Sequence, residues 1–332
     1  MKAILLDGFG GPEVMKIGSA EPPPLTPGRV LIKVAATTVN RPDVMQRKGH
    51  YPPPPGETPL LGLECAGTVE ALGAGVTSFD RGDRVFALLA GGGYAELAAA
   101  HADHVLRIPN GMSFAAAACI CETYITAYMN LFGNARLKDG EAVLLHGGGG
   151  GVTTAAMQLC KVLTPRTRVL VTASTGKVER VRALGAERVI DYRNEDFAEI
   201  VRAATGGRGA DVILDHIGGP YLAGNVQALA VGGRLALIGV MGGRKAELDL
   251  ARVLTQRLTI VGSVLWPRSV EEKAAIIRDF ARDVMPHFAA GRMAPLIHRI
   301  YPIEQATEAH RAMEAGEHFG KLVLAFDEGA SA

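Results

Sequence analysis

The sequence has few aromatic residues, no long apolar run and no excess of charge of either sign. Aromatic side chains make up 5% of the 332 residues, and 35 lysines and arginines stand against 34 acidic residues, a formal net charge of +1 at pH 7. No long run of like charges interrupts this balance. Proteins that bind nucleic-acid phosphates or membrane surfaces carry such basic patches. We therefore expect neither a nucleic acid nor a membrane as a partner.

Signals for membrane insertion or secretion are also missing. The longest apolar runs, such as 114–120, fall far short of the roughly 20 residues that span a bilayer. Asp7 follows the first apolar residues too early for the apolar part of a signal peptide. Apolar sequence surrounds every cysteine, which predicts buried free thiols in a reducing, cytoplasmic compartment. The four cysteines are Cys65, Cys119, Cys121 and Cys160.

Glycine, in contrast, is abundant, at 41 of 332 residues or about 12%, against about 7% in average proteins. Without a three-residue period, these glycines predict tight turns and close approaches of the backbone. Of all residues, 48% are hydrophobic, as in globular proteins, and the length predicts about two domains.

Residues 1–121 contain short apolar segments separated by turn residues. This spacing predicts a β-rich sandwich or partly open barrel. The proline-rich segments 21–28 and 51–59 lack backbone donors and are predicted to be surface loops. The predicted strands are 28–40, 67–76, 83–89, 94–100 and 104–109.

From 122 to 265, apolar strands alternate with helical segments. Six strands joined by crossover helices predict an α/β domain with a doubly wound parallel sheet, the Rossmann arrangement. Gly185, after Leu184, is a helix stop. The predicted strands are 141–148, 168–174, 188–191, 210–219, 233–240 and 258–265, and the predicted helices are 152–163, 177–185, 195–205 and 220–230.

Residues 266–332 carry two amphipathic segments, 269–290 and 303–315, and a strand-like end at 320–326. This tail is too small for a core of its own, so we expect it to pack on the first stretch. The predicted domains are therefore 1–121 with 266–332, and 122–265.

The most informative motif is the glycine run HGGGGGV at 146–152, between a predicted strand and a predicted helix. Such a loop brings backbone donors close to a pyrophosphate at the helix N-terminus, whereas a flexible glycine run is the alternative. Thr153 stands where the third glycine of the fingerprint belongs. Its branched side chain either pushes the helix outward or contacts phosphate. The predicted phosphate-binding residues are Gly148, Gly149, Gly150, Gly151, Val152 and Thr153.

The choice of cofactor depends on the end of the next strand. A site for NAD carries Asp or Glu there to bind the ribose 2′-hydroxyl, but 168–175 contains no acid. Ser174, Lys177 and Tyr192 follow instead, and hydroxyl and cationic donors suit a 2′-phosphate. NADPH is therefore the predicted cofactor. A solvated lysine is the alternative for Lys177, although a cation in a first helical turn is unfavourable without an anion nearby.

A series of motifs in order along nearly the whole chain resembles the medium-chain dehydrogenase/reductase superfamily. The closest likeness is to its zinc-independent quinone oxidoreductase branch, the zeta-crystallin-like enzymes. The resemblance implies a GroES-like catalytic domain formed by both termini, a Rossmann domain, and homodimers joined through edge strands of the cofactor domain. The motifs are VNRPDVMQRKGHYPPPP (39–55), GLECAGTVEALGAGV (62–76), GDRVFAL (82–88), GGYAEL (92–97), CETYITAY (121–128), LLHGGGGGVTTAAMQL (144–159), DHIGG (215–219) and FGKLVLAF (319–326).

The zinc enzymes of this superfamily carry GHE and a lobe of four cysteines. Here Leu63 replaces that histidine. Cys119 and Cys121 are separated by one residue on a predicted helix or turn, so their side chains face different directions. His101 and His104 share a face without further ligands and are interpreted as a surface pair. We expect no metal and no flavin.

The resemblance implies that the nicotinamide lies in the cleft between the domains. It assigns Asn40 and Tyr51 to reach the nicotinamide and Thr126 to contact its carboxamide. Alternatives are a turn cap for Asn40, a staple of the proline loop for Tyr51 and an ordinary helical position for Thr126. Further residues assigned to the cofactor are His216, Gly239, Met241, Leu265, Trp266 and Lys321.

Asp43 and Arg47, four residues apart, are predicted to form a local helix pair. No Ser–His–Asp or paired-carboxylate arrangement is present, which agrees with chemistry supplied by the cofactor. Three functions remain open. They are an NADPH-dependent quinone oxidoreductase, a reductase of activated C=C bonds in enones or enoyl thioesters, and an NADPH-binding structural or RNA-binding protein with residual activity.

Overall fold

The computed structural model describes residues 1–326, which form two compact units. The first unit comprises Met1–Ile125 together with the described residues from Trp266 onward, and the second is Thr126–Leu265. The sequence places the first boundary at 121/122, whereas helix α3 (Cys121–Tyr128) runs across it without a break. Within the described residues, no helix is both long enough and apolar enough to span a membrane.

The second unit is built on a six-stranded parallel sheet with the order β10-β9-β8-β11-β12-β13. This order confirms the doubly wound Rossmann sheet. The central strands β8 and β11 are buried along their whole length, and they are accordingly rich in apolar residues. The strands are β8 (Ala142–Leu145), β9 (Arg168–Ala173), β10 (Arg188–Asp191), β11 (Ala210–Asp215), β12 (Leu229–Leu237) and β13 (Thr259–Gly262).

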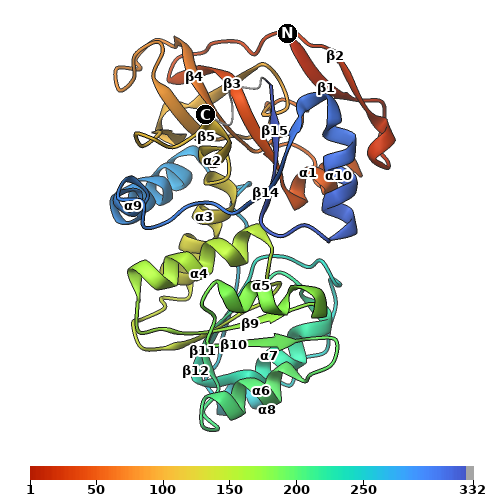
Figure 1. Cartoon of the computed structure of the whole chain (residues 1–332), viewed down its shortest axis with the longest axis vertical. Coiled ribbons are helices and arrows are strands. Elements are labelled where there is room, and N and C mark those ends of the chain that lie inside the picture. Colours follow the sequence, from red (N-terminus) through yellow and green to blue (C-terminus); the bar gives the residue numbers. More distant parts are fainter. Residues whose placement is uncertain (327–332) are drawn as a thin grey trace. The chain divides into compact units, whose positions relative to one another are not determined.

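Helices cover both faces of this sheet, α4 and α5 on one and α6 and α7 on the other (Figure 1). Gly185, with φ of 96°, follows the end of α5, as its sequence position predicts. The short α8 is not predicted, because six residues are too few to show a helical repeat. The helices are α4 (Gly151–Leu163), α5 (Val178–Ala183), α6 (Phe197–Ala204), α7 (Leu222–Ala228) and α8 (Leu250–Thr255).

The first unit contains a seven-stranded sheet, in which six strands follow the order β14-β15-β3-β4-β5-β7 and the seventh, β6, pairs with β3. The long strand β3 pairs antiparallel with β4 along its length, with β6 through its first half and with β15 through its second. One strand thereby joins the N-terminal and C-terminal segments. The strands are β3 (Arg29–Val39), β4 (Glu64–Leu72), β5 (Arg84–Leu88), β6 (Leu97–His101), β7 (Val105–Arg107), β14 (Ile297–Pro302) and β15 (Lys321–Ala325).

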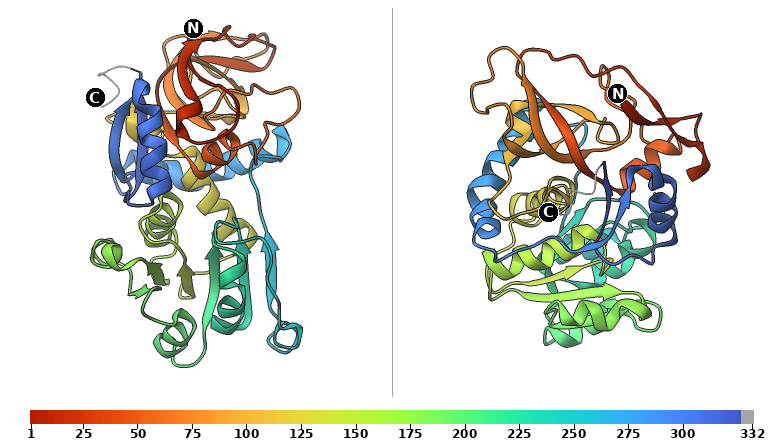
Figure 2. Two further views of the ribbon diagram at one scale, coloured as in Figure 1. Left: turned by 90° about the vertical axis from the view of Figure 1, so that its right-hand side faces the viewer. Right: turned by 45° about the horizontal axis from the view of Figure 1, so that its top comes forward.

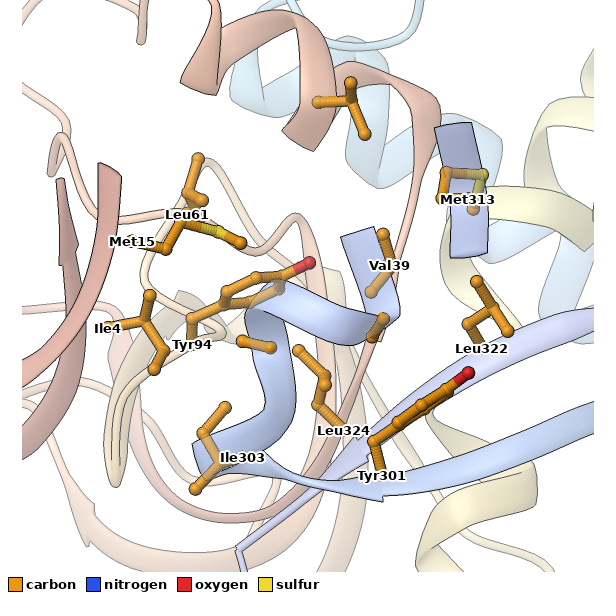
Figure 3. Packing of buried hydrophobic residues seen from close by; sticks show 13 residues of the cluster. Ile4, Met15, Val39, Leu61, Tyr94, Tyr301, Ile303, Met313, Leu322 and Leu324 are labelled. Atoms are coloured by element: carbon orange, nitrogen blue, oxygen red, sulfur yellow. The ribbon is translucent and has the colours of Figure 1, made fainter. Parts of the chain in front are cut away.

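The C-terminal segment packs on the N-terminal strands of the same unit, as the sequence predicts (Figure 2). Figure 3 shows how Leu61 and Tyr94 from the N-terminal part share one core with Ile303 and Leu322 from the C-terminal part. Each cysteine is buried and free, which confirms the prediction of buried free thiols. The remaining elements of the unit are β1 (Lys2–Leu6), β2 (Met15–Ser19), α1 (Arg41–Arg47), α2 (Phe114–Ala117), α9 (Val270–Ala289) and α10 (Ala306–Ala315).

Candidate functional site

In the second unit, the glycine run forms a tight turn between β8 and α4. Gly147 has φ of 70°, and a Cβ there would lie 2.3 Å from Nε2 of His216. A Cβ on Gly148 would lie 2.9 Å from Cγ1 of Val171 and 3.0 Å from the carbonyl oxygen of Thr172. Side chains are therefore excluded at both positions, and the backbone itself forms the surface of the loop.

The first turn of α4 opens onto this loop. Its N-cap is Gly150, in extended conformation, which provides no side chain to accept from the helix. The N–H groups of a first helical turn have no partner within the helix and attract anions. A 13-residue helix behind a glycine turn therefore fits a pyrophosphate.

Thr153, at the third glycine position of the fingerprint, bonds to the protein backbone, which neither of the two interpretations from the sequence included. Thr153 is 1% exposed, and its hydroxyl donates to the carbonyl oxygen of His146 at 2.6 Å. The hydroxyl proton is thus committed to the backbone rather than to a phosphate. The bond ties the first turn of α4 to the end of β8.

The residues predicted for the 2′-phosphate follow the carboxyl ends of adjacent strands. Ser174 comes directly after β9 and precedes a short turn that ends at Lys177, and both are half-buried. Tyr192 follows β10 and is 41% exposed. Asp191, the last residue of β10, accepts from Arg193 N and Asn194 Nδ2 at 3.1 and 2.8 Å. No acid lies within β9 itself.

The segment after β11 lies against the glycine loop. The carbonyl oxygen of His216 accepts from Met241 N at 3.0 Å, and a Cβ on Gly239 would lie 3.0 Å from the same oxygen. The structure thus brings His216, Gly239 and Met241 together beside Gly147. Leu265, also assigned to the cofactor, is buried at the end of the unit.

In the first unit, a buried polar cluster surrounds Glu64. Its Oε1 accepts from Lys321 Nζ and Asn40 Nδ2, both at 3.0 Å, and from the hydroxyl of Thr38. Its Oε2 accepts from Glu122 N at 2.8 Å. Asn40 Oδ1 in turn accepts from Lys321 at 2.5 Å. The side chain of Asn40 is therefore held within this cluster, although the residue is also the N-cap of α1.

The prediction of a helix pair between Asp43 and Arg47 is wrong. Asp43 is fully buried and accepts from the backbone N–H groups of Asn40 and Gly62, at 2.7 and 3.1 Å. Burial, opposed by these bonds, raises its pKa to about 7. Arg47 instead pairs with Glu314 at 2.8 Å. Tertiary partners thus replace the local i,i+4 contact.

Tyr51 packs its ring on Trp266 of the same unit, with ring centroids 3.9 Å apart. Burial, followed by the nearby carboxylates of Glu122 and Asp43, raises the pKa of Tyr51 above its usual range. The hydroxyl is therefore protonated at neutral pH. Thr126 is the first residue of the second unit, half-buried on α3, and its carbonyl oxygen accepts from Asn130 at 2.8 Å.

Sequence reasoning missed Glu64 and Glu122. Burial and the carboxylates of Glu64 and Asp43 raise the pKa of Glu122 to about 8. Glu64 directly follows Leu63, the residue that stands at the position of the zinc-binding histidine. The signal available was a glutamate within the otherwise apolar segment 61–67, since a charged residue in such a place requires a partner.

Residues 1–326 contain no group of three His, Cys, Asp or Glu side chains arranged to hold a metal ion. The expected surface pair of histidines needs a correction. His104 is buried, and its Nε2 lies 3.1 Å from the carbonyl oxygen of Val270, while the His101 ring lies 5.4 Å away. His104 therefore connects its loop to the start of α9.

A glycine loop at the carboxyl edge of a Rossmann sheet, in a chain that also contains a β-rich unit, defines a dinucleotide-dependent dehydrogenase fold. Residues 26–110 match the alcohol dehydrogenase GroES-like domain, and residues 184–324 match the zinc-binding dehydrogenase family. A quinone oxidoreductase of Lama guanicoe is 36% identical over 98% of this chain and 97% of its own.

Among solved structures, a mycobacterial protein complexed with NADPH is 31% identical, with a TM-score of 0.88 over 98% of this chain and 100% of its own. The CurK enoyl reductase is 27% identical, with a TM-score of 0.86 over 98% of each chain. The chain belongs to the medium-chain dehydrogenase/reductase superfamily, in its quinone oxidoreductase branch. It is an oxidoreductase of that family.

Proposed function

We propose that the protein is an NADPH-dependent, zinc-independent quinone oxidoreductase. The observation that carries the cofactor choice is the end of β9, where Ser174 and Lys177 stand and an acid is missing. Full-length similarity to quinone oxidoreductases supports the acceptor. Leu63 at the position of the histidine ligand supports zinc independence.

The second unit would hold the cofactor. The glycine loop and the first turn of α4 would bind the pyrophosphate, and Ser174, Lys177 and Tyr192 the 2′-phosphate. The solved relative that is complexed with NADPH supports NADPH as the cofactor. When bound, NADPH supplies a hydride. In the first unit, Tyr51, whose hydroxyl is protonated at neutral pH, would supply a proton to the reduced product.

The primary test is NADPH oxidation, followed by absorbance, with an ortho-quinone, a para-quinone and an alkenal offered separately. We expect fast turnover with a quinone and slower turnover with NADH. Failure to oxidise NADPH with any quinone would overturn the proposal, and oxidation with the alkenal alone would favour the second candidate below.

The second candidate is a reductase of activated C=C bonds. The similarity to an enoyl reductase and the half-buried, protonated Tyr51 support it. Carbon protonation depends on a positioned donor more strongly than does formation of a hydroquinone, which water can protonate. Tyr51→Phe should therefore reduce alkenal turnover at least tenfold more than quinone turnover.

Lys177 provides a separate test of the cofactor. Lys177→Glu should raise the KM for NADPH at least tenfold and leave the KM for NADH nearly unchanged, because only NADPH carries the 2′-phosphate. The control is Lys161→Glu, an exposed lysine of α4 with the same change of charge. Equal effects of Lys177→Glu on both cofactors would remove Lys177 from the site.

A further inference from the structure

A chain of hydrogen bonds runs beneath the glycine loop and has His146 at its centre. The Nδ1 atom of His146 lies 2.9 Å from Oγ1 of Thr172, and Nε2 lies 2.7 Å from Oδ1 of Asn225. Asn225 Nδ2 donates to Oδ2 of Asp215 at 2.9 Å. At the other end, Gly147 N donates to Oγ1 of Thr172 at 3.3 Å. These side chains come from three neighbouring strand ends and from α7.

The donors and acceptors that each side chain offers fix which atom donates in every bond of this series. Asn225 uses its amide donor on Asp215, so only its oxygen faces His146, and Nε2 of His146 must carry the proton. In a neutral ring, Nδ1 then accepts from the hydroxyl of Thr172. That hydroxyl oxygen keeps a lone pair for the N–H of Gly147. Every donor along the path therefore has an acceptor.

The surroundings keep His146 neutral. The side chain is 1% exposed, and burial lowers its pKa to about 3. The rings of Phe197 and Tyr221 pack on it with centroids at 5.0 and 4.8 Å. The titratable groups that face it are His216, whose charge would oppose protonation, Tyr221 and, beyond Asn225, Asp215.

Both ends of this series of hydrogen bonds lie in loops at the carboxyl edge of the sheet. Oδ1 of Asp215 accepts from Ile217 N and Gly218 N at 2.6 and 3.3 Å, which shapes the turn that carries His216. The backbone oxygen of His146 accepts from Thr153, which adds the first turn of α4. One buried histidine thereby connects the glycine loop, the turn after β11 and the helix N-terminus.

We propose that His146, as the neutral Nε2–H tautomer, is a positioning residue that orients the Gly147 peptide and the 215–218 turn for dinucleotide binding. The inference rests on the proposed function, because it takes the glycine loop as the pyrophosphate site. It also explains how Thr153 replaces a fingerprint glycine, since the threonine hydroxyl bonds the backbone of this same histidine.

The affinity test uses Thr172, which connects His146 to the loop. Thr172→Val has nearly the same shape but removes the hydroxyl, and we expect it to raise the Kd for NADPH about five- to tenfold, as loss of one hydrogen bond does. Thr172→Ser restores the hydroxyl and should restore the affinity. The control is Thr164→Val, a buried threonine at the far end of α4. Isothermal titration calorimetry measures each Kd without turnover.

The tautomer is tested separately on the wild-type protein by nitrogen-15 NMR of labelled histidine, with His146→Gln used for assignment. We expect a protonated Nε2 and an unprotonated Nδ1 from pH 8 to pH 5. A charged ring, a protonated Nδ1, or equal NADPH affinities of Thr172→Val and Thr172→Ser would overturn the inference. No NADPH binding by the wild-type protein would instead overturn the proposed function on which the inference rests.

Discussion

Buried charges in the first unit depend on one another. Glu64 and Lys321 are 1% and 6% exposed at their side chains and lie 3.0 Å apart. Removal of charged groups from water is costly, and the cost is recovered only through close partners. The bonds from Asn40, Thr38 and Glu122 N supply those partners.

Loss of one member of this pair should therefore destabilise the protein strongly. We expect Lys321→Met to lower the free energy of unfolding by about 3–5 kcal/mol, because it leaves the carboxylate of Glu64 buried and unpaired. The double variant Glu64→Gln/Lys321→Met should be clearly more stable than the sum of the two single changes predicts. Chemical denaturation of all four proteins tests this, and simple additivity would contradict it.

A second buried network contains His310. Its Nδ1 lies 3.2 Å from the guanidinium of Arg47, which can only donate, so Nε2 carries the proton and faces the hydroxyl of Tyr94 at 3.0 Å. Burial and the charge of Arg47 lower the pKa of His310 to about 3. A neutral ring is thus required in the folded protein.

This histidine makes stability depend on pH. Its pKa is about 3 when folded and about 6.5 when unfolded, so between these values only the unfolded chain binds the proton. Its contribution to stability is therefore full above about pH 6.5 and is lost as the pH falls. We expect His310→Gln to reduce the slope of unfolding free energy against pH near pH 5 by about 1.4 kcal/mol per pH unit. Tyr94→Phe, which keeps the histidine, should retain the slope.

Among the elements, the turn between β8 and α4 is closely constrained by packing. Gly147 combines a positive φ with the ring of His216 at 2.3 Å from a hypothetical Cβ. Gly185, also at positive φ, has no atom within 4 Å of such a Cβ. The two glycines thus share the backbone requirement and differ in the space around them.

Alanine substitutions at these two glycines therefore distinguish the effect of backbone strain from the effect of displacing the loop. Gly185→Ala should lower stability by about 1 kcal/mol and leave the Kd for NADPH unchanged. Gly147→Ala should in addition raise that Kd at least tenfold, because His216 must move. Calorimetric binding and thermal unfolding of both variants provide the check, and equal Kd values would contradict a shape-dependent phosphate loop.

For the whole molecule, the parallel sheet of the second unit ends at β13. No described strand pairs with its outer edge. Large apolar side chains are exposed on β13, with Ile260 at 37%, and on α8, the helix that precedes it in the chain, with Leu250 at 70% and Leu254 at 78%. An open apolar edge favours pairing with another strand. We propose that a second copy of this chain covers it.

A charge on this edge should therefore prevent self-association. Ile260→Lys should convert a homodimer to a monomer in light scattering coupled to gel filtration. Ile17→Lys, on the exposed strand β2 of the first unit, is the matched control and should remain dimeric. A monomeric wild-type protein would refute the assignment.

Local sequence patterns were sufficient to predict the order of strands and helices in the second unit. Continuous apolar strands, helical segments between them and Gly185 at a helix end each act within a few residues, so they are visible in the sequence. The glycine run between β8 and α4 and the missing acid in β9 are equally local. Strand β14 and helix α8 were missed because their stability comes from pairing and packing rather than from periodicity.

Contacts between distant residues could not be obtained in this way. Lys321 donates to Glu64, which lies 257 positions away in the sequence. Arg47 pairs with Glu314 rather than with Asp43 on its own helix. His146 bonds Thr172 because neighbouring parallel strands bring their ends together, and it bonds Asn225 because α7 packs against the same part of the sheet. Local patterns determine which elements form. The partner of a buried polar group is decided by the tertiary structure, which places certain groups within hydrogen-bonding distance. The free-energy cost of leaving such a group unpaired exceeds any local preference for a neighbouring residue.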